Sequence, residues 1–184
     1  MSDTLTKVTP KYVGWKVTRE EYLSLPDDGF TYDMIEGVLH LSPSAYFDHG
    51  NLQTYFATEL SIYLRTHPLG RLTTETDIFL PDDGDVLRPD LSFILNENLS
   101  IIKGHIHGVP DLICEVLSES TKSRDLGVKA DRYLRCGVRE YWILDPKEKT
   151  SQVWYNVNSK SWQKQKHEKL VSKILPDFVL EKIV

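Results

Sequence analysis

The chain has 184 residues, of which 40% are hydrophobic and 27% are charged, and it contains four Trp residues. This length suits one domain with a sizeable buried core, and this composition excludes an intrinsically disordered chain. The formal net charge of −5 hides an asymmetry, because residues 1–98 carry 7 basic and 16 acidic side chains whereas residues 99–184 carry 15 basic and 11 acidic ones. An acidic half followed by a basic half suggests a polar partner or site that the total charge conceals.

The sequence contains no stretch typical of secretion or of membrane insertion. Met1 to Lys11 is polar, and the longest apolar runs are far shorter than the roughly 20 residues that a membrane span needs. Cys114 and Cys136 each lie in an apolar segment and cannot build a disulfide framework, which favours a reducing compartment. We therefore expect a cytoplasmic protein without membrane association.

The first third of the chain predicts a loosely ordered start followed by a helix, a hairpin and a second helix. Residues 1–14 lack a pattern, whereas Thr18 to Leu25 predicts a short helix capped by Thr18. Residues 31–41 predict two strands around the turn Glu36-Gly37. Apolar residues at helical spacing predict a helix capped by Asp48 and running to about Arg65. The residues of that apolar face are Leu52, Tyr55, Phe56, Leu60 and Tyr63.

The rest of the chain predicts mainly strands. Strands are expected at about 72–80 and 88–95, joined by the acidic turn 81–85, and residues 111–117 are apolar on both faces except for Glu115, as in a central strand.

A helix is expected over 124–136, where Gly137 ends it, followed by a strand over 138–144 and two or three strands around 158–160. The sum is a mixed sheet flanked by helices, in a single α/β or α+β domain spanning residues 1–184.

Two carboxylates in apolar strands are the first candidates for chemistry. Glu115 has only apolar neighbours, so its carboxylate must be paired, protonated or bound to a cation. Asp90 opens the strand that follows Arg88-Pro89. If the two strands are neighbours, their oxygens suit Mg²⁺ or Mn²⁺. A salt-bridged Glu115 at a strand end, and an Asp90 that only closes a turn, are the alternative interpretations.

Lys129 is the third candidate. On a helical wheel it lies within roughly 40° of Tyr133, at the edge of the inward face. Its ammonium can therefore point into a site. It can equally reach solvent along the surface, or pair with Asp125 one turn earlier, and these alternatives stay open.

Four segments together resemble one known family. They are Arg88-Pro89-Asp90-Leu91, Pro110 through Ser118, Asp125 through Lys129 to Tyr133, and Gly137 through Trp142. This succession resembles a family of uncharacterised endonucleases within the PD-(D/E)XK superfamily, which has the restriction-endonuclease-like fold. The resemblance extends over roughly Thr18 to Phe178.

The resemblance implies an αβββαβ core, with extra β-hairpins at the N-terminal and C-terminal ends, and a Mg²⁺-dependent endonuclease that hydrolyses phosphodiester bonds in DNA. Asp90 and Glu115 match the metal-binding and catalytic acids of the signature. The signature's lysine is expected two residues after the second acid, where this chain has Leu117, and Lys129 resembles a lysine displaced to the next helix. Glu36 resembles an acidic residue that sometimes joins such catalytic metal sites, although Glu-Gly is also ordinary turn chemistry.

Other readings stay open. The missing lysine at position 117 suits a catalytically inactive nucleic-acid-binding or scaffold module of the same fold, and two carboxylates also suit acid–base hydrolysis of another substrate. His49 is expected at a helix start or core edge, and His105 and His107 are expected in a loop without zinc-binding partners. Cutting two strands is easier with two sites, so we also expect a homodimer.

Overall fold

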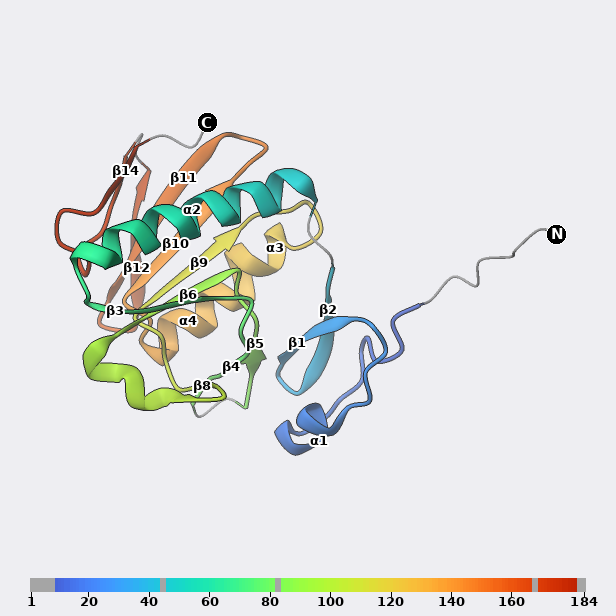
Figure 1. Ribbon diagram of the computed structural model, residues 1–184. Coiled ribbons are helices and arrows are strands. Elements are labelled where there is room, and N and C mark those ends of the chain that lie inside the picture. The colour runs from blue at the N-terminus through green and yellow to red at the C-terminus, as the bar shows by residue number, and fades with distance from the viewer. Residues whose placement is uncertain (1–8, 44–45, 82–83, 167–168, 182–184) are drawn as a thin grey trace.

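The apolar strand that carries Glu115 lies inside a six-stranded sheet. A computed structural model describes residues 9–43, 46–81, 84–166 and 169–181 (Figure 1). The strands of this sheet, in spatial order, are β12 (Ser161–Lys166), β11 (Thr150–Val157), β10 (Glu140–Asp145), β9 (Leu112–Val116), β6 (Leu91–Leu95) and β3 (Gly70–Thr74). Strand β9 runs parallel to β10 and antiparallel to β6. Every residue of β9 and β10 is buried, as the two-sided apolar pattern predicts.

Helices cover the two faces of this sheet. The long helix α2 (Phe47–Thr66) crosses one face in Figure 1 and packs Phe56 and Leu60 against β6, β9 and β10. The opposite face is covered by α3 (Lys122–Arg124), a turn of π-helix η2 (Asp125–Lys129) and α4 (Ala130–Cys136). In chain order α2, β3, β6, β9, α4 and β10 form the predicted αβββαβ core, and the fold class is mixed α+β.

A second six-stranded sheet contains the N-terminal hairpin. Its strands, in spatial order, are β2 (Val38–Ser42), β1 (Thr31–Ile35), β5 (Val86–Leu87), β4 (Ile78–Phe79), β8 (His105–His107) and β7 (Ile102–Lys103). The remaining elements are α1 (Arg19–Ser24), the 3₁₀ helix η1 (Asn96–Ile101) and the hairpin of β13 (Lys169–Val171) and β14 (Val179–Glu181). We call residues 9–43, with α1, β1 and β2, the N-terminal module, which lies to one side of the first sheet (Figure 1).

Local sequence rules account for several element ends. Thr18 caps α1, where its hydroxyl accepts from the Glu21 N–H and the Glu21 carboxylate accepts from the Thr18 N–H. The β1–β2 turn has Glu36 at φ 53° and Gly37 at φ 75°, as tight hairpins require. Gly137 ends α4 at φ 97°, a left-handed position that favours glycine.

The expected strand 72–80 is divided, and the expected strand 88–95 begins later, at Leu91, after a separate short strand at 86–87. Residues 70–74 and 91–95 belong to the first sheet, whereas 78–79 and 86–87 belong to the second. Glu75 has φ 48°, which cannot continue a strand, and the proline at position 89 cannot donate to a sheet ladder. The chain therefore changes sheets at both points. The acidic turn expected between these strands includes residues 82–83, which lie outside the described residues.

Two further expectations need correction. Tyr46 occupies the cap position of α2 without a side-chain bond, and Asp48 instead lies in the first turn, where its charge favours the helix dipole. The two histidines of residues 105–107 lie in strand β8, which pairs with β4 and β7, and not in a loop. In the segment 1–14, residues 1–8 lie outside the described residues and Tyr12 is buried against Tyr32, and the loose order of this segment stays a prediction.

No helix in the described part of the chain combines the length and apolar character needed to cross a membrane.

Candidate active site

Strand alternation places Glu115 on the side of the sheet that α4 covers. Its neighbours at two-residue spacing, Ile113 and Leu117, pack in the cluster that contains α4, whereas Cys114 packs with α2. Glu115 is only 3% exposed. A carboxylate on a fully covered face must therefore find its partners within the protein.

Asp90 lies directly across from Glu115 on the neighbouring antiparallel strand. The register pairs Leu91 with Cys114, so the residues immediately before and after them are also opposite each other. The Asp90 N–H lies 3.3 Å from Glu115 Oε2, and the Asp90 Oδ2 atom accepts from the Val116 N–H at 2.6 Å. The structure thus brings together the two carboxylates that the sequence selected.

Lys129 reaches this pair from η2. Its Nζ lies 3.1 Å from Glu115 Oε1, 3.3 Å from Asp33 Oδ2 and 3.4 Å from Asp125 Oδ1. The side chain is 4% exposed, so the ammonium points inward and does not reach solvent. An ammonium has three N–H donors, and each has a carboxylate within reach. The ion pair with Asp125 coexists with the contact to Glu115, so two of the expected interpretations hold at once.

Burial and charge together set the protonation of this cluster. Burial raises the pKa of Glu115 well above its usual range, against the opposing effect of the Lys129 ammonium. Burial likewise raises the pKa of Asp125. Burial alone would lower the pKa of Lys129, but Asp33, Glu115 and Asp125 more than offset this, and the pKa is raised well above its usual value. The Lys129 ammonium therefore stays charged, and the three surrounding carboxylates share this one positive charge.

A cavity of about 500 Å³ opens beside the cluster. Its wall includes His49, Arg88, Asp90, Glu115, Asp125 and Lys129. His49, from the first turns of α2, places Nε2 3.3 Å from Asp90 Oδ2. Burial lowers the pKa of His49, but the hydrogen bond and the charge of Asp90 raise this pKa by a larger amount. The pKa of His49 is therefore higher than usual. The cavity thus connects the carboxylates to the outside along a wall of both polar and apolar side chains.

The donor set suits a hard divalent cation. Asp90 Oδ1 accepts no hydrogen bond from the described residues, and Glu115 Oε2 receives only the long N–H contact from Asp90. No group of three His, Cys, Asp or Glu side chains in the described ranges is arranged to hold a metal. Mg²⁺ commonly uses one or two carboxylates and keeps several waters, so one free and one weakly bonded carboxylate oxygen at a cavity wall are sufficient for it.

The sequence analysis missed two members of the cluster. Asp33, in the middle of β1, is fully buried, and its Oδ1 accepts from the Arg88 N–H at 2.9 Å. The Tyr133 hydroxyl lies 3.2 Å from Glu115 Oε1. The sequence signal for Asp33 was the same one that selected Glu115, a single carboxylate within an apolar strand. Glu36, the acidic residue chosen from this hairpin, instead pairs with Arg132 and has a side chain that is 73% exposed.

Comparison with known proteins gives a consistent family assignment. Residues 19–182 match the model of the Uma2 family, described as "Putative restriction endonuclease". A crystal structure titled as a "putative nuclease belonging to DUF820" from Anabaena variabilis superposes with a TM-score of 0.76 at 18% identity, covering 90% of this chain and 94% of the other. That likeness shows a shared fold. No curated protein matches the sequence.

Proposed function

The chain belongs to the Uma2 family of restriction-endonuclease-like proteins, and from that premise we propose that it is a Mg²⁺-dependent nuclease that hydrolyses phosphodiester bonds in DNA, with Mn²⁺ as an alternative metal. The family and the fold support a nuclease in general. The metal, the DNA substrate and the residue roles are the specific content of the proposal. We also propose that the chain works as one domain, because residues from both sheets share one apolar cluster.

One observation carries the proposal, and it is the arrangement of Asp90 and Glu115. They lie opposite each other at a cavity wall, and each retains an oxygen that is free or weakly bonded among the described residues. Three carboxylates surround the Lys129 ammonium there, and Asp90 lies beside one of them, Glu115. The guanidinium of Arg124 lies 3.8 Å from Asp33 as a further cation. An excess of negative charge that borders a cavity favours the binding of a divalent cation.

The residues have separate roles in this proposal. Asp90 and Glu115 would hold Mg²⁺, which when bound lowers the pKa of a water and relieves charge on a phosphate. Lys129 orients Glu115 through the 3.1 Å contact and keeps a fixed positive charge beside the reacting phosphate. Asp33 and Asp125 hold the Lys129 ammonium in place, and Tyr133 fixes the other side of the same Glu115 oxygen.

The test is cleavage of supercoiled, linear and single-stranded DNA by Asp90→Asn and Glu115→Gln variants in Mg²⁺ and in Mn²⁺. We expect each variant to lose at least about a hundredfold in rate while it keeps its circular dichroism spectrum. The matched control is Glu59→Gln, which removes a partly buried carboxylate from α2 outside the cavity wall. Cleavage that persists in both variants, or that survives a chelator, would contradict the proposal.

A catalytically inactive nucleic-acid-binding module is the second candidate, because Leu117 is buried where the signature has its lysine. For that candidate, parent and variants would bind DNA equally and would cut none of the substrates. Preference for DNA over RNA, a cytoplasmic location and a homodimer stay predictions.

A further inference from the structure

Arg88 is a second charged feature of the same cavity, and the proposed cleavage does not use it. It lies in the loop between β5 and β6, two residues before Asp90, and it lines the cavity together with Asp90, Glu115 and Lys129. Its backbone N–H donates to Asp33, which fixes the loop against β1. The position of the Arg88 backbone is therefore tied to the carboxylate cluster.

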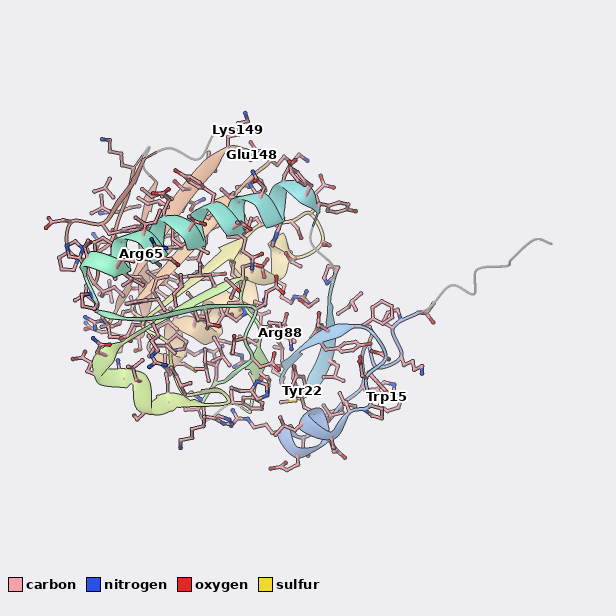
Figure 2. All side chains as sticks on the ribbon, viewed as in Figure 1. Trp15, Tyr22, Arg65, Arg88, Glu148 and Lys149 are labelled. Carbon is pink, nitrogen blue, oxygen red and sulfur yellow. The ribbon has the colours of Figure 1, made fainter. Side chains whose placement is uncertain are left out.

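The guanidinium of Arg88 is held from one side only. Its Nε donates to Asp77 Oδ1 at 2.7 Å, and Asp77 is a buried carboxylate whose other oxygen lies 3.3 Å from the Tyr22 hydroxyl. The two Nη nitrogens of Arg88 donate no hydrogen bond to the described residues, and the side chain is 27% exposed. Figure 2 shows Tyr22 and Arg88 close together where the N-terminal module meets the rest of the protein. The guanidinium is thus oriented, while most of its donors remain free.

The other two cations of the cavity wall are already paired with carboxylates, and the remaining ring nitrogen of His49, Nδ1, is buried without a hydrogen bond among the described residues. Among the described lining residues, only His49, Arg88 and Lys129 can carry a positive charge. Lys129 faces three carboxylates with its three donors, and the Nε2 of His49 pairs with Asp90. Arg88 is therefore the cation in this wall that can still bind an anion. An anionic ligand in a cavity rich in carboxylates needs such a group to offset repulsion.

We propose that Arg88 forms a phosphate-binding subsite, in which its Nη nitrogens hold the non-bridging oxygens of a substrate phosphodiester beside the Asp90–Glu115 pair. A guanidinium presents parallel donors that match a phosphate in bidentate geometry, and it keeps its charge at every physiological pH. Asp77 is a positioning residue, because its bond to Nε turns the free edge of the guanidinium away from itself. The assignment of the ligand as a nucleic-acid phosphate rests on the proposed function.

The experiment measures binding of a fluorescent DNA oligonucleotide, single-stranded and duplex, at several salt concentrations with a chelator present so that nothing is cleaved. For Arg88→Ala we expect affinity to fall about 10- to 100-fold, because charged hydrogen bonds to phosphate are lost. The slope of log affinity against log salt should fall by about 0.7 to 0.9, the value of one phosphate contact. The matched control is Arg65→Ala, which removes the same charge near the far end of α2 (Figure 2) and should change neither quantity.

Two further variants separate phosphate binding from folding. Arg88→Ala leaves the buried Asp77 without its cation, so we compare Asp77→Asn with Asp77→Asn/Arg88→Gln, in which no uncompensated charge remains. Both should fold, and only the double variant should show the lower salt slope. Arg88→Lys retains the positive charge but loses the paired donors of the guanidinium. It should therefore keep the parental slope of log affinity against log salt and lose part of the affinity.

A neutral methylphosphonate placed at single linkages of the oligonucleotide identifies the contact. One linkage should weaken binding to the parent and have no further effect on binding to Arg88→Ala. The proposal is overturned if Arg88→Ala and Arg65→Ala behave alike, if no linkage is sensitive, or if the parent binds neither oligonucleotide at low salt. A protein that cuts DNA through Glu115 without needing Arg88 would refute only this inference, whereas one that binds through Arg88 and cuts nothing would refute only the proposed cleavage.

Discussion

Two buried glutamates on adjacent parallel strands have opposite surroundings. Glu115 lies near the end of β9 and Glu140 begins β10, and they are 3% and 1% exposed. Alternation puts Glu115 on the face covered by α4, whereas Glu140 shares the face of Trp142, which packs with α2. One residue type in one sheet therefore faces two different parts of the molecule.

Neutral donors surround Glu140. Its carboxylate accepts from the Trp142 indole, from the Ser172 hydroxyl and from the backbone N–H groups of Lys173 and Ile174 at 2.6–3.1 Å. Burial raises the pKa of Glu140, and these bonds oppose that rise. All of its partners except Trp142 come from the segment before β14, so this carboxylate fastens the C-terminal segment to the sheet.

Glu115 differs in the kind of partner it has. It shares one ammonium with Asp33 and Asp125, its remaining contacts are a phenol and a long backbone N–H, and it borders a cavity. A buried carboxylate whose acceptors are filled by neutral donors stabilises the fold. One that competes with other carboxylates beside a cavity is suited to binding a cation. The partners, and not the burial, distinguish the two roles.

The largest expected effect is that substitution of Glu140 lowers stability but not cleavage, whereas substitution of Glu115 abolishes cleavage but hardly changes stability. Glu140→Ala leaves the Trp142 indole, the Ser172 hydroxyl and the Lys173 N–H without their acceptor, while the Ile174 N–H keeps only the Ser172 hydroxyl. We therefore expect the free energy of unfolding to fall by about 3–5 kcal/mol. Glu115→Gln keeps an acceptor for Tyr133 and Lys129, so its stability should stay within about 1 kcal/mol of the parent. Urea denaturation of both variants measures this difference.

Cleavage should show the reverse order. Glu140→Ala, assayed at a temperature where it is fully folded, should cut at the parental rate, whereas Glu115→Gln should not cut. If Glu140→Ala were as stable as the parent, or if it were folded but cut no DNA, the two glutamates would not have these separate roles.

The next effect is a pH dependence that belongs to Glu115. Folding raises the pKa of Glu115. At a pH above the usual pKa of a carboxyl group, Glu115 therefore keeps its proton in the native state but has lost it in the unfolded chain. This contribution to stability is present below about pH 4.3 and is lost as pH rises through the folded pKa. In chelator, the parent should lose stability relative to Glu115→Gln as pH increases, with a slope of up to about 1.4 kcal/mol per pH unit. Denaturation of both proteins across this range tests the sign, and parallel curves would show that Glu115 is ionised throughout.

The smallest effects should come from one hydroxyl on each side of the sheet. Tyr133→Phe removes a single donor to Glu115, so it should cost about 0.5–1.5 kcal/mol of stability and shift the pH dependence further upward. Ser172→Ala removes a donor to Glu140 and an acceptor for two backbone N–H groups, so it should cost slightly more stability. It should raise the pKa of Glu140 further, but leave the contribution of Glu115 to the pH dependence unchanged. Equal pH profiles for the two variants would show that Tyr133 does not act through Glu115.

Sequence reasoning recovered much of the core and part of the site. A continuous apolar strand containing one carboxylate identified β9 and Glu115, because the cost of burying a charge is a local property of the sequence. The pairing of Asp90 with Glu115 depended on their strands being neighbours, and the observed register fulfils that condition. The helix wheel placed Lys129 at the edge of a buried face, but it left open whether the ammonium points inward.

What lay beyond the sequence came from contacts between distant segments. Asp33 carries the same sequence signal as Glu115, but the prediction selected Glu36 in the nearby turn. Only the docking of β1 beside η2 shows that Asp33, and not Glu36, contacts Lys129. Arg124 donates to the Leu41 carbonyl across that boundary, which helps to hold the N-terminal module against α3. No local pattern encodes this packing.

Elements that follow short-range rules can be predicted from the sequence, and they include the Thr18 cap, the hairpin turn before β2, the left-handed Gly137 and the buried strand around Glu115. Packing between distant segments sets which charges share an ammonium, which buried glutamate is satisfied by neutral donors and which arginine keeps free donors at the cavity. The two kinds of feature differ because propensity, capping and alternation act over a few residues. The protonation and binding capacity of a buried group depend instead on all the charges and dipoles that packing brings around it.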